Sequence, residues 1–291
     1  MASLALLVGC RPTLATTGPL PPDAGLVARV DGGRALGRDA TGSVYVVEAG
    51  RAAVTVTEAS GLASGPIGGP GTGPGTFIEP SDVDPTSGLA VFVADAAAGT
   101  VQRFTESRQS AETIAVPDVD PTRAAPSAEA VQAAAEGRIA RGRPVGVAAL
   151  PGGGLAIVEA SRGVVLVLDA RRRLERVVGA GTLRAPVGVA VDADGALWVA
   201  DAGASRVVVF TPYGELVRTV EASGLGRVQR VRRAGRGMLV VGAGGVLGVD
   251  AVGATRWTRP LALGEPVVDA ALDGDALFVL TPTRLVRVPR P

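Results

Sequence analysis

The 291-residue sequence contains no histidine, no lysine and no asparagine, so all 29 of its basic side chains are arginines. Mechanisms that need an imidazole or an amine side chain therefore lack their reagent, which excludes histidine-based metal sites, Ser-His-Asp triads and Schiff-base lysines. Aromatic residues make up only 3% of the chain, and its single cysteine, Cys10, cannot form an intramolecular disulfide. The sequence therefore predicts neither a metal site nor a cofactor.

What the sequence has in abundance is short apolar segments separated by turn residues. Hydrophobic residues account for 47% of the chain, and 41 glycines and 21 prolines interrupt them. This composition is typical of many short strands and is not that of a disordered chain. The net charge of +1 gives no overall field that would attract nucleic acid or an anionic membrane.

The first ten residues form a short apolar run that ends Leu7-Val8-Gly9-Cys10. This run resembles the lipobox of bacterial lipoproteins, in which a lipid is attached to the cysteine after cleavage before it. The alternative is a buried first strand with a chance cysteine, because the run is short for a signal sequence and no basic residue precedes it. Under the lipoprotein interpretation, residues 1–25 are a signal followed by a proline-rich tether.

The resemblance to lipoproteins implies that Cys10 carries the lipid and that this anchor alone holds the protein at the membrane, in the cell envelope. Arg11 follows the cysteine in place of the aspartate that often retains such proteins at an inner membrane, which favours the outer membrane in a host that has one. No later apolar stretch approaches the roughly 18 uncharged residues of a transmembrane helix.

One segment recurs along the rest of the chain: a strand with alternating apolar residues, a turn, an apolar strand that ends in an acid, and a further strand. The clearest copy spans residues 186–210, other copies cover residues 42–48, 80–95 and 144–159, and two weaker ones lie at 238–242 and 276–281. The acids or their equivalents stand at positions 48, 95, 159, 201, 242 and 281. A period near 40 residues with several strands per unit predicts the blades of a β-propeller.

The copy from Pro186 to Phe210 resembles the blade motif of the NHL-repeat β-propellers nearly throughout, with Ala204 where that family usually has asparagine. The resemblance implies an all-β fold, a six-bladed β-propeller over residues 26–291. A propeller must close its ring, because an open ring leaves unpaired strand edges. We expect the strand at Leu26–Val30 to supply the outer strand of the final blade, beside the last strand at Arg284–Val288.

The longest interval between repeats contains an insertion, at about residues 111–142. Its core, from Pro126 to Gly137, is predicted to be a helix with Ser127 as N-cap and Glu129 in the first turn. We interpret the insertion as a surface element that caps one side of the ring; the alternative is that it binds a partner.

A set of repeated carboxylates offers the first candidate site: Glu48, Asp95, Glu159 and Asp201. In a propeller they fall at the same end of equivalent strands, where they could surround an entrance and hold a cation. The favoured interpretation is structural, because an acid at a strand end accepts backbone N–H groups in the adjoining turn.

Related propellers suggest two other functions. Sugar-lactone hydrolases of the regucalcin type resemble this architecture, but their metal is held by Glu, Asn and Asp, so a metal-dependent lactone or ester hydrolase would here need an all-carboxylate site. Some NHL propellers bind RNA through a basic face, and here the candidate basic surface consists of Arg171, Arg172, Arg173, Arg230, Arg232 and Arg233. Aromatic residues for base stacking are scarce near these arginines.

The function that the sequence favours is a non-catalytic binding or scaffold propeller of the cell envelope. A rigid ring presents loops from several blades, and loops on a rigid frame are where recognition usually occurs. The expected partner is an unidentified envelope protein or glycan, with no nucleic acid and no enzymatic activity.

Overall fold

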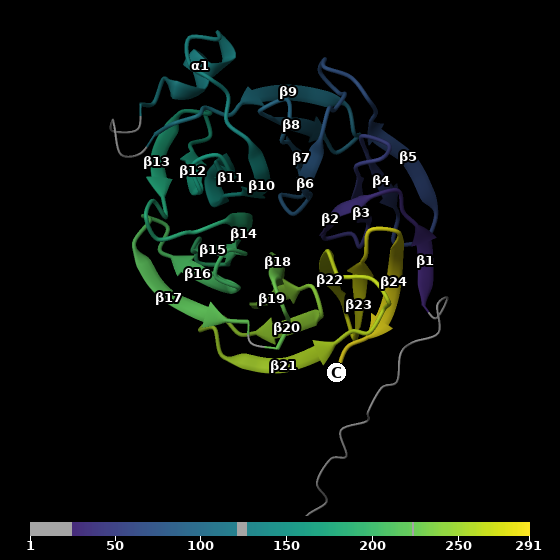
Figure 1. The fold of residues 1–291 in the computed structure, drawn as a ribbon. Coiled ribbons are helices and arrows are strands. Elements are labelled where there is room, and N and C mark those ends of the chain that lie inside the picture. Colours follow the sequence, from purple (N-terminus) through teal and green to yellow (C-terminus); the bar gives the residue numbers. More distant parts are fainter. Residues whose placement is uncertain (1–24, 121–126, 223) are drawn as a thin grey trace, which may run out of the picture.

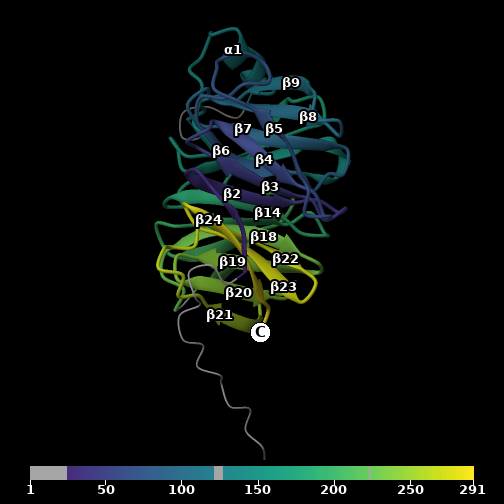
Figure 2. The same ribbon diagram turned by 90° about the vertical axis from the view of Figure 1, so that its right-hand side faces the viewer.

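The computed structural model describes residues 25–120, 127–222 and 224–291 of the chain. These residues form six four-stranded antiparallel sheets arranged around a central axis (Figure 1). Figure 2 shows the ring from its side, where it is narrower along the axis than across it. The fold is therefore the six-bladed β-propeller that the repeat predicts.

Each of the first five blades takes its four strands from one continuous stretch of chain, with the first strand innermost and the fourth outermost (Figure 1). Blade 1 consists of β2 (Gly33–Arg38), β3 (Val44–Glu48), β4 (Ala53–Thr57) and β5 (Ala63–Gly68). Blade 2 consists of β6 (Pro80–Asp84), β7 (Ala90–Asp95), β8 (Thr100–Thr105) and β9 (Ser110–Ala115). Blade 3 consists of β10 (Pro144–Ala149), β11 (Leu155–Glu159), β12 (Val164–Leu168) and β13 (Leu174–Val178), with a short 3-10 turn at Pro151–Gly153.

Blade 4 consists of β14 (Pro186–Val191), β15 (Leu197–Asp201), β16 (Arg206–Phe210) and β17 (Leu216–Glu221). Blade 5 consists of β18 (Val228–Ala234), β19 (Gly237–Gly242), β20 (Gly245–Val249) and β21 (Thr255–Pro260). Blade 6 takes β22 (Asp269–Asp273), β23 (Ala276–Leu280) and β24 (Arg284–Pro289) from the C-terminal part of the chain.

The fourth strand of blade 6 comes from the other end of the sequence. Strand β1 (Leu26–Arg29) pairs antiparallel with β24 and forms the outer edge of the blade. Figure 1 shows this purple strand outside the yellow β24. The prediction that the N-terminal strand completes the final blade is confirmed, and the ring is closed by hydrogen bonds between the two ends of the described chain.

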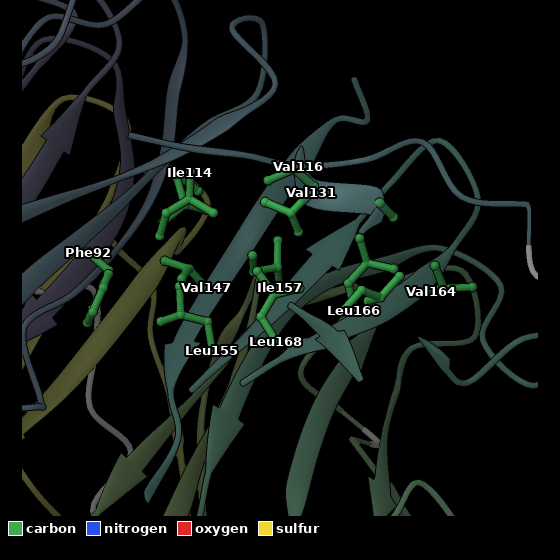
Figure 3. Packing of buried hydrophobic residues seen from close by; sticks show 14 of the residues in the cluster. Phe92, Ile114, Val116, Val131, Val147, Leu155, Ile157, Val164, Leu166 and Leu168 are labelled. Carbon is green, nitrogen blue, oxygen red and sulfur yellow. The ribbon is translucent and has the colours of Figure 1, made fainter. Parts of the chain in front are cut away.

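The hydrophobic core is divided among the blades. Six clusters of buried residues lie one between each pair of neighbouring blades, and the smallest of them joins blade 6 to blade 1. Figure 3 shows the cluster between blades 2 and 3, where Phe92 and Ile114 of one blade face Val147, Ile157 and Leu166 of the next. The sheets therefore pack face to face around the ring, and the axis itself is left to other side chains.

The insertion is shorter at its start than predicted, because residues 110–115 form strand β9 and pair with β8. Helix α1 (Ala130–Ala135) is also shorter than the predicted helix: its N-cap is Glu129, which makes no side-chain cap hydrogen bond. Ser127 lies two residues earlier and accepts a hydrogen bond from the Glu129 N–H at 3.2 Å. Ala130 and Val131 of the helix pack into the cluster between blades 2 and 3 (Figure 3), so the helix covers the edge of that interface. In the parts of the chain that the structure describes, no helix has the length and hydrophobicity needed to cross a membrane.

Candidate functional site

The two ends of the ring differ in their loops. We call one end the carboxylate end. There the first strand of each blade begins, the second strand ends, and the chain crosses from one blade to the next. At the other end, the pocket end, turns join the first strand to the second and the third to the fourth. The four predicted carboxylates all lie at the carboxylate end, because each pairs in register with the first residue of its blade's innermost strand.

All four repeated carboxylates are buried, and each accepts backbone N–H groups at 2.8–3.1 Å. The donors are Asp31 for Glu48, Ile78, Glu79 and Ala98 for Asp95, Arg143, Ser161 and Arg162 for Glu159, and Arg184 and Ala185 for Asp201. These donors belong to the loop that enters the blade and, in two blades, also to the turn after the acid. The carboxylates thus hold each blade's entering loop against its second strand.

The structure places Arg230 and Arg232, two members of the candidate basic surface, at the axis of the ring and not on its outer face. Both lie on β18, the innermost strand of blade 5, and extend across the axis of the ring. Register with the equivalent strand β14 places Arg230 where blade 4 has Gly188, and Arg232 where it has Ala190. Side chains at these two positions point toward the axis, so the two long arginines occupy the centre of the propeller.

Arg232 forms the centre of an axial ion network. Its Nη2 donates to Asp82 of blade 2 at 2.6 Å and to Asp269 of blade 6 at 2.5 Å, and its Nε donates to both Asp269 oxygens. Both aspartates are fully buried, and the Arg232 side chain is 12% exposed. Each aspartate also accepts a backbone N–H from a neighbouring blade, from Val147 at 2.9 Å and from Leu36 at 2.7 Å. Arg232 therefore ties together strands from opposite sides of the ring.

Arg230 bonds to backbone carbonyl groups and not to acids. It donates to the carbonyl oxygens of Arg34, Ser81 and Val187, which belong to blades 1, 2 and 4. Gly188 makes room for it, because a Cβ at that position would lie 3.1 Å from the Arg230 Cδ. The guanidinium thus satisfies carbonyl groups from three other blades near the axis.

Burial and charge shift the ionisation of the axial groups in different directions. Burial alone would lower the pKa of Arg232, but Asp269 and Asp82 raise the pKa above that of an ordinary arginine. Burial lowers the pKa of Arg230, which has no carboxylate bonded to it. Burial also raises the pKa of Asp84, partly offset by hydrogen bonds from Thr86 and Ala149.

A pocket of about 600 Å³ opens at the pocket end, beside the axial network. Its floor and walls are largely apolar and come mainly from the innermost strands and first turns of blades 2, 3 and 4, including Ala148 and Ala190, with Phe92 from the second strand of blade 2. The small side chains at Ala148 and Ala190 are the reason that the hollow exists, because both occupy positions that face the axis. A smaller hollow of about 280 Å³, lined by blades 1, 2, 5 and 6, shares Arg232 and Arg233 with it.

Four arginines from three blades line the larger pocket: Arg103, Arg172, Arg232 and Arg233. Members of both basic clusters of the sequence thus meet at the pocket, although only Arg233 of the second cluster is exposed. Arg172 is held by Glu112 at 3.1 Å and lies over the Phe92 ring, at 5.7 Å from its centroid. Arg173 pairs with Asp169 at 2.7 Å beside the pocket, and Arg171 is exposed on the same turn.

Asp82, Asp84, Asp269 and Arg103 were not identified as site residues from the sequence. Asp82 and Asp84 stand inside a recognised repeat, and their positions hold glycine or alanine in blades 3 and 4. A charged residue where sister repeats have a small one is a signal that aligning the repeats could have revealed. Arg103 lies on the third strand of its blade, at a position that holds valine in blades 1, 3 and 4, so the same comparison of repeats marks it as well.

Cys10, the predicted lipid-attachment residue, lies outside the described residues, as do residues 1–24 of the predicted signal and tether. Over residues 25–120, 127–222 and 224–291, no three Asp, Glu, His or Cys side chains come together as a candidate metal site.

The fold and the axial arrangement define the class: a six-bladed β-propeller with an arginine network at its centre. Within it, residues 183–210, which include most of blade 4, match the family model of the NHL repeat. No curated protein matches the sequence significantly.

Solved structures of similar fold include enzymes and a binding complex. A gluconolactonase from Xanthomonas campestris has a TM-score of 0.68 at 13% identity, over 91% of this chain and 89% of its own. A catalytically inactive variant of virginiamycin B lyase from Staphylococcus aureus, with a histidine replaced by alanine and quinupristin present, has a TM-score of 0.62 at 11% identity, over 89% and 80%. A chain of a nidogen/laminin complex has a TM-score of 0.60 at 16% identity, over 81% and 83%. At these identities the likeness concerns the fold alone.

Proposed function

We propose that this protein is a non-catalytic binding propeller of the cell envelope that recognises its partner at the pocket end of the ring. The observation that supports this most is the position of Arg232. The two buried carboxylates that meet at the axis, Asp82 and Asp269, are bridged by its guanidinium. A cation built into the chain is therefore already paired with both of these acids, which makes them poor ligands for a catalytic metal.

The comparison with the lyase supports the same conclusion. The variant of that protein in which a histidine is replaced is described as catalytically inactive. The present sequence has no histidine at any position, so it offers no side chain of that type for such chemistry.

A metal-dependent lactone or ester hydrolase is the second candidate, favoured by the likeness in fold to the gluconolactonase and by the carboxyl group of Asp84 in the pocket wall. The two functions are separated by assaying hydrolysis of gluconolactone and simple esters with added Ca²⁺, Mg²⁺, Mn²⁺ or Zn²⁺, beside an authentic lactonase. We expect no turnover above the buffer rate. Turnover that a chelator removes would establish the hydrolase instead.

Recognition at the pocket end is tested with a photocrosslinking amino acid placed at either end of the ring. Leu89 is 80% exposed and lines the pocket, whereas Ile78 is 49% exposed at the carboxylate end. We expect a discrete crosslinked species in envelope extracts from position 89 and none from position 78. Crosslinking from position 78 alone would place recognition at the other end.

The anchor is a separate part of the proposal, based on the lipobox-like run that ends at Cys10. A Cys10→Ser variant should leave the membrane fraction, and the wild-type protein should incorporate labelled fatty acid. An unmodified peptide spanning residues 9–11 in the mature protein would disprove the anchor without affecting the argument from the pocket.

A further inference from the structure

We propose that the pocket binds a small organic carboxylate, with the acidic group on its arginines and an apolar body on its floor. The proposal specifies the ligand chemistry of the proposed recognition site and rests on that proposed function for its location. It follows from which hydrogen-bonding groups of the pocket already have partners and which do not.

The carboxylates in the pocket wall have their oxygens occupied. Asp84 accepts from the Ala149 N–H at 2.6 Å and from both the N–H and the hydroxyl of Thr86. Asp192 accepts from the Trp198 indole at 2.9 Å and from two backbone N–H groups of its own turn. These acids are therefore bound within the protein and are poor candidates to hold a cationic ligand.

The arginines of the pocket have donors to spare. The side chain of Arg233 is exposed and makes no hydrogen bond or ion pair with any other described residue. Arg232 uses its Nε and Nη2 for the two axial aspartates, so its Nη1 has no partner among the described residues. Arg103 has a single distant ion pair, with Glu112 at 3.8 Å. A ligand that supplies acceptor oxygens would complete these groups.

One of these donors is held rigidly. Two buried carboxylates hold the Arg232 guanidinium in one orientation, so its outer nitrogen loses little conformational freedom when a ligand binds. Planar guanidinium groups suit carboxylate oxygens, and hydrogen bonds between charged groups are about twice as strong as neutral ones.

The rest of the pocket requires an apolar body on the ligand. Ala90, Phe92, Val147, Ala148 and Leu150 line it, and Leu89 stands exposed at its mouth. A volume of about 600 Å³ holds a small organic molecule and is far larger than a bare inorganic anion needs. Charge on one side and hydrocarbon on the other favour an amphipathic carboxylate over sulfate or a sugar.

The test uses the full-length protein and calorimetric titration with hexanoate, benzoate and N-acetyl-leucine, each beside its uncharged amide and beside inorganic sulfate. We expect at least one carboxylate to bind saturably at one site, and its amide and sulfate to bind at least about tenfold more weakly. Equal binding of the amide, equal binding of sulfate, or no saturable binding of any carboxylate would overturn the proposal.

Two exposed arginines, one at the end of β18 and one in the turn that follows it, supply a matched pair of variants. Arg233 lines the pocket, and Arg236 lies three residues further on and does not. Arg233→Ala should weaken carboxylate binding about tenfold, and Arg236→Ala should leave it nearly unchanged. An equal loss in both would show that only general charge is at work.

A third variant blocks the pocket without changing its charge. Ala170 is exposed on the pocket wall, and Ala170→Trp should abolish carboxylate binding while the thermal midpoint stays that of the wild type. Undiminished binding in this variant would place the ligand elsewhere. Hydrolysis is assayed separately, so the two proposals can fail independently. Carboxylate binding together with turnover would refute the non-catalytic function and leave the carboxylate site intact. Absence of both binding and turnover would refute the carboxylate site and leave the non-catalytic function intact.

Discussion

The two ends of the propeller use charged residues in opposite ways. At the carboxylate end, four acids repeat in register, are buried and accept backbone N–H groups within their own blades. At the pocket end and along the axis, the charges do not repeat: Arg230 and Arg232 belong to one blade, and Asp82, the acidic partner of Arg232, belongs to another. Repetition thus marks the residues that build each blade, and departures from it mark those that distinguish this propeller.

The comparison implies that the axial network is a stability element as well as a wall of the pocket. Arg232→Met would leave two buried carboxylates without their counter-charge, which should cost about 3–5 kcal/mol of unfolding free energy. Chemical denaturation measures this, with Arg233→Met as a control that changes the same charge at an exposed neighbour. Equal stability of the two variants would show that the network contributes little.

A smaller loss is expected from a single repeated carboxylate. Asp95→Ala removes the acceptor of three backbone N–H groups and should cost roughly 2–4 kcal/mol. Asp194→Ala, an exposed acid whose side chain accepts no hydrogen bond from the described residues, is the control and should have little effect. Suppose that Asp95→Ala changed neither the unfolding free energy nor the binding of a carboxylate ligand at the pocket. The conclusion that these acids hold the entering loops in place would then be wrong.

The pH dependence of stability sharpens the comparison at Asp84. Burial raises its pKa in the folded protein, so the folded state binds the proton more tightly than the unfolded state. Its contribution to stability is therefore most favourable at low pH and declines as the pH rises from about 4 through the folded-state pKa. The unfolding free energies of the wild type and of Asp84→Asn should be measured over that range. As the pH rises, the wild type should lose stability relative to Asp84→Asn. A difference that does not vary with pH would contradict the shift.

The smallest of these stability effects is expected at Arg233, a residue that is proposed to contribute to carboxylate binding. Arg233→Ala should change the unfolding free energy by no more than about 0.5 kcal/mol, because the side chain is exposed and unbonded. A loss comparable to that of Arg232→Met would show that Arg233 supports the fold, and its role in binding could then not be separated from folding.

The fold could be predicted from the sequence because a blade repeats both its hydrophobic alternation and its acid. Pro186–Phe210 carries the pattern almost complete, and the weaker copies preserve its spacing, so the number of blades and the N-terminal closing strand both follow. The pocket did not follow, because its residues are brought together by the ring from blades far apart in the sequence. Arg232 reaches Asp82 across 150 positions, and only a closed ring makes these two residues neighbours.

The predicted start of the helix is wrong for a local reason. Serine is a preferred N-cap residue, which is why the sequence predicts that Ser127 caps the helix. The helix nevertheless begins only at Ala130, where burial against the neighbouring blades starts. Tertiary packing outweighed capping chemistry in a segment this short.

Blade 6 joins β1 to β24, and this imposes an order on the making of the molecule. The five other blades draw on contiguous chain and can form as soon as each is synthesised, but Arg29 cannot meet Arg284 until the chain between them, which holds those five blades, has been synthesised. Until then β24 has no neighbour on its outer side, and the smallest of the six inter-blade clusters is the one still to be assembled. A nascent chain stalled before residue 284 would therefore expose a strand edge of the kind that other β-strands join, and the synthesis of β24 is the step that allows the edge to be covered.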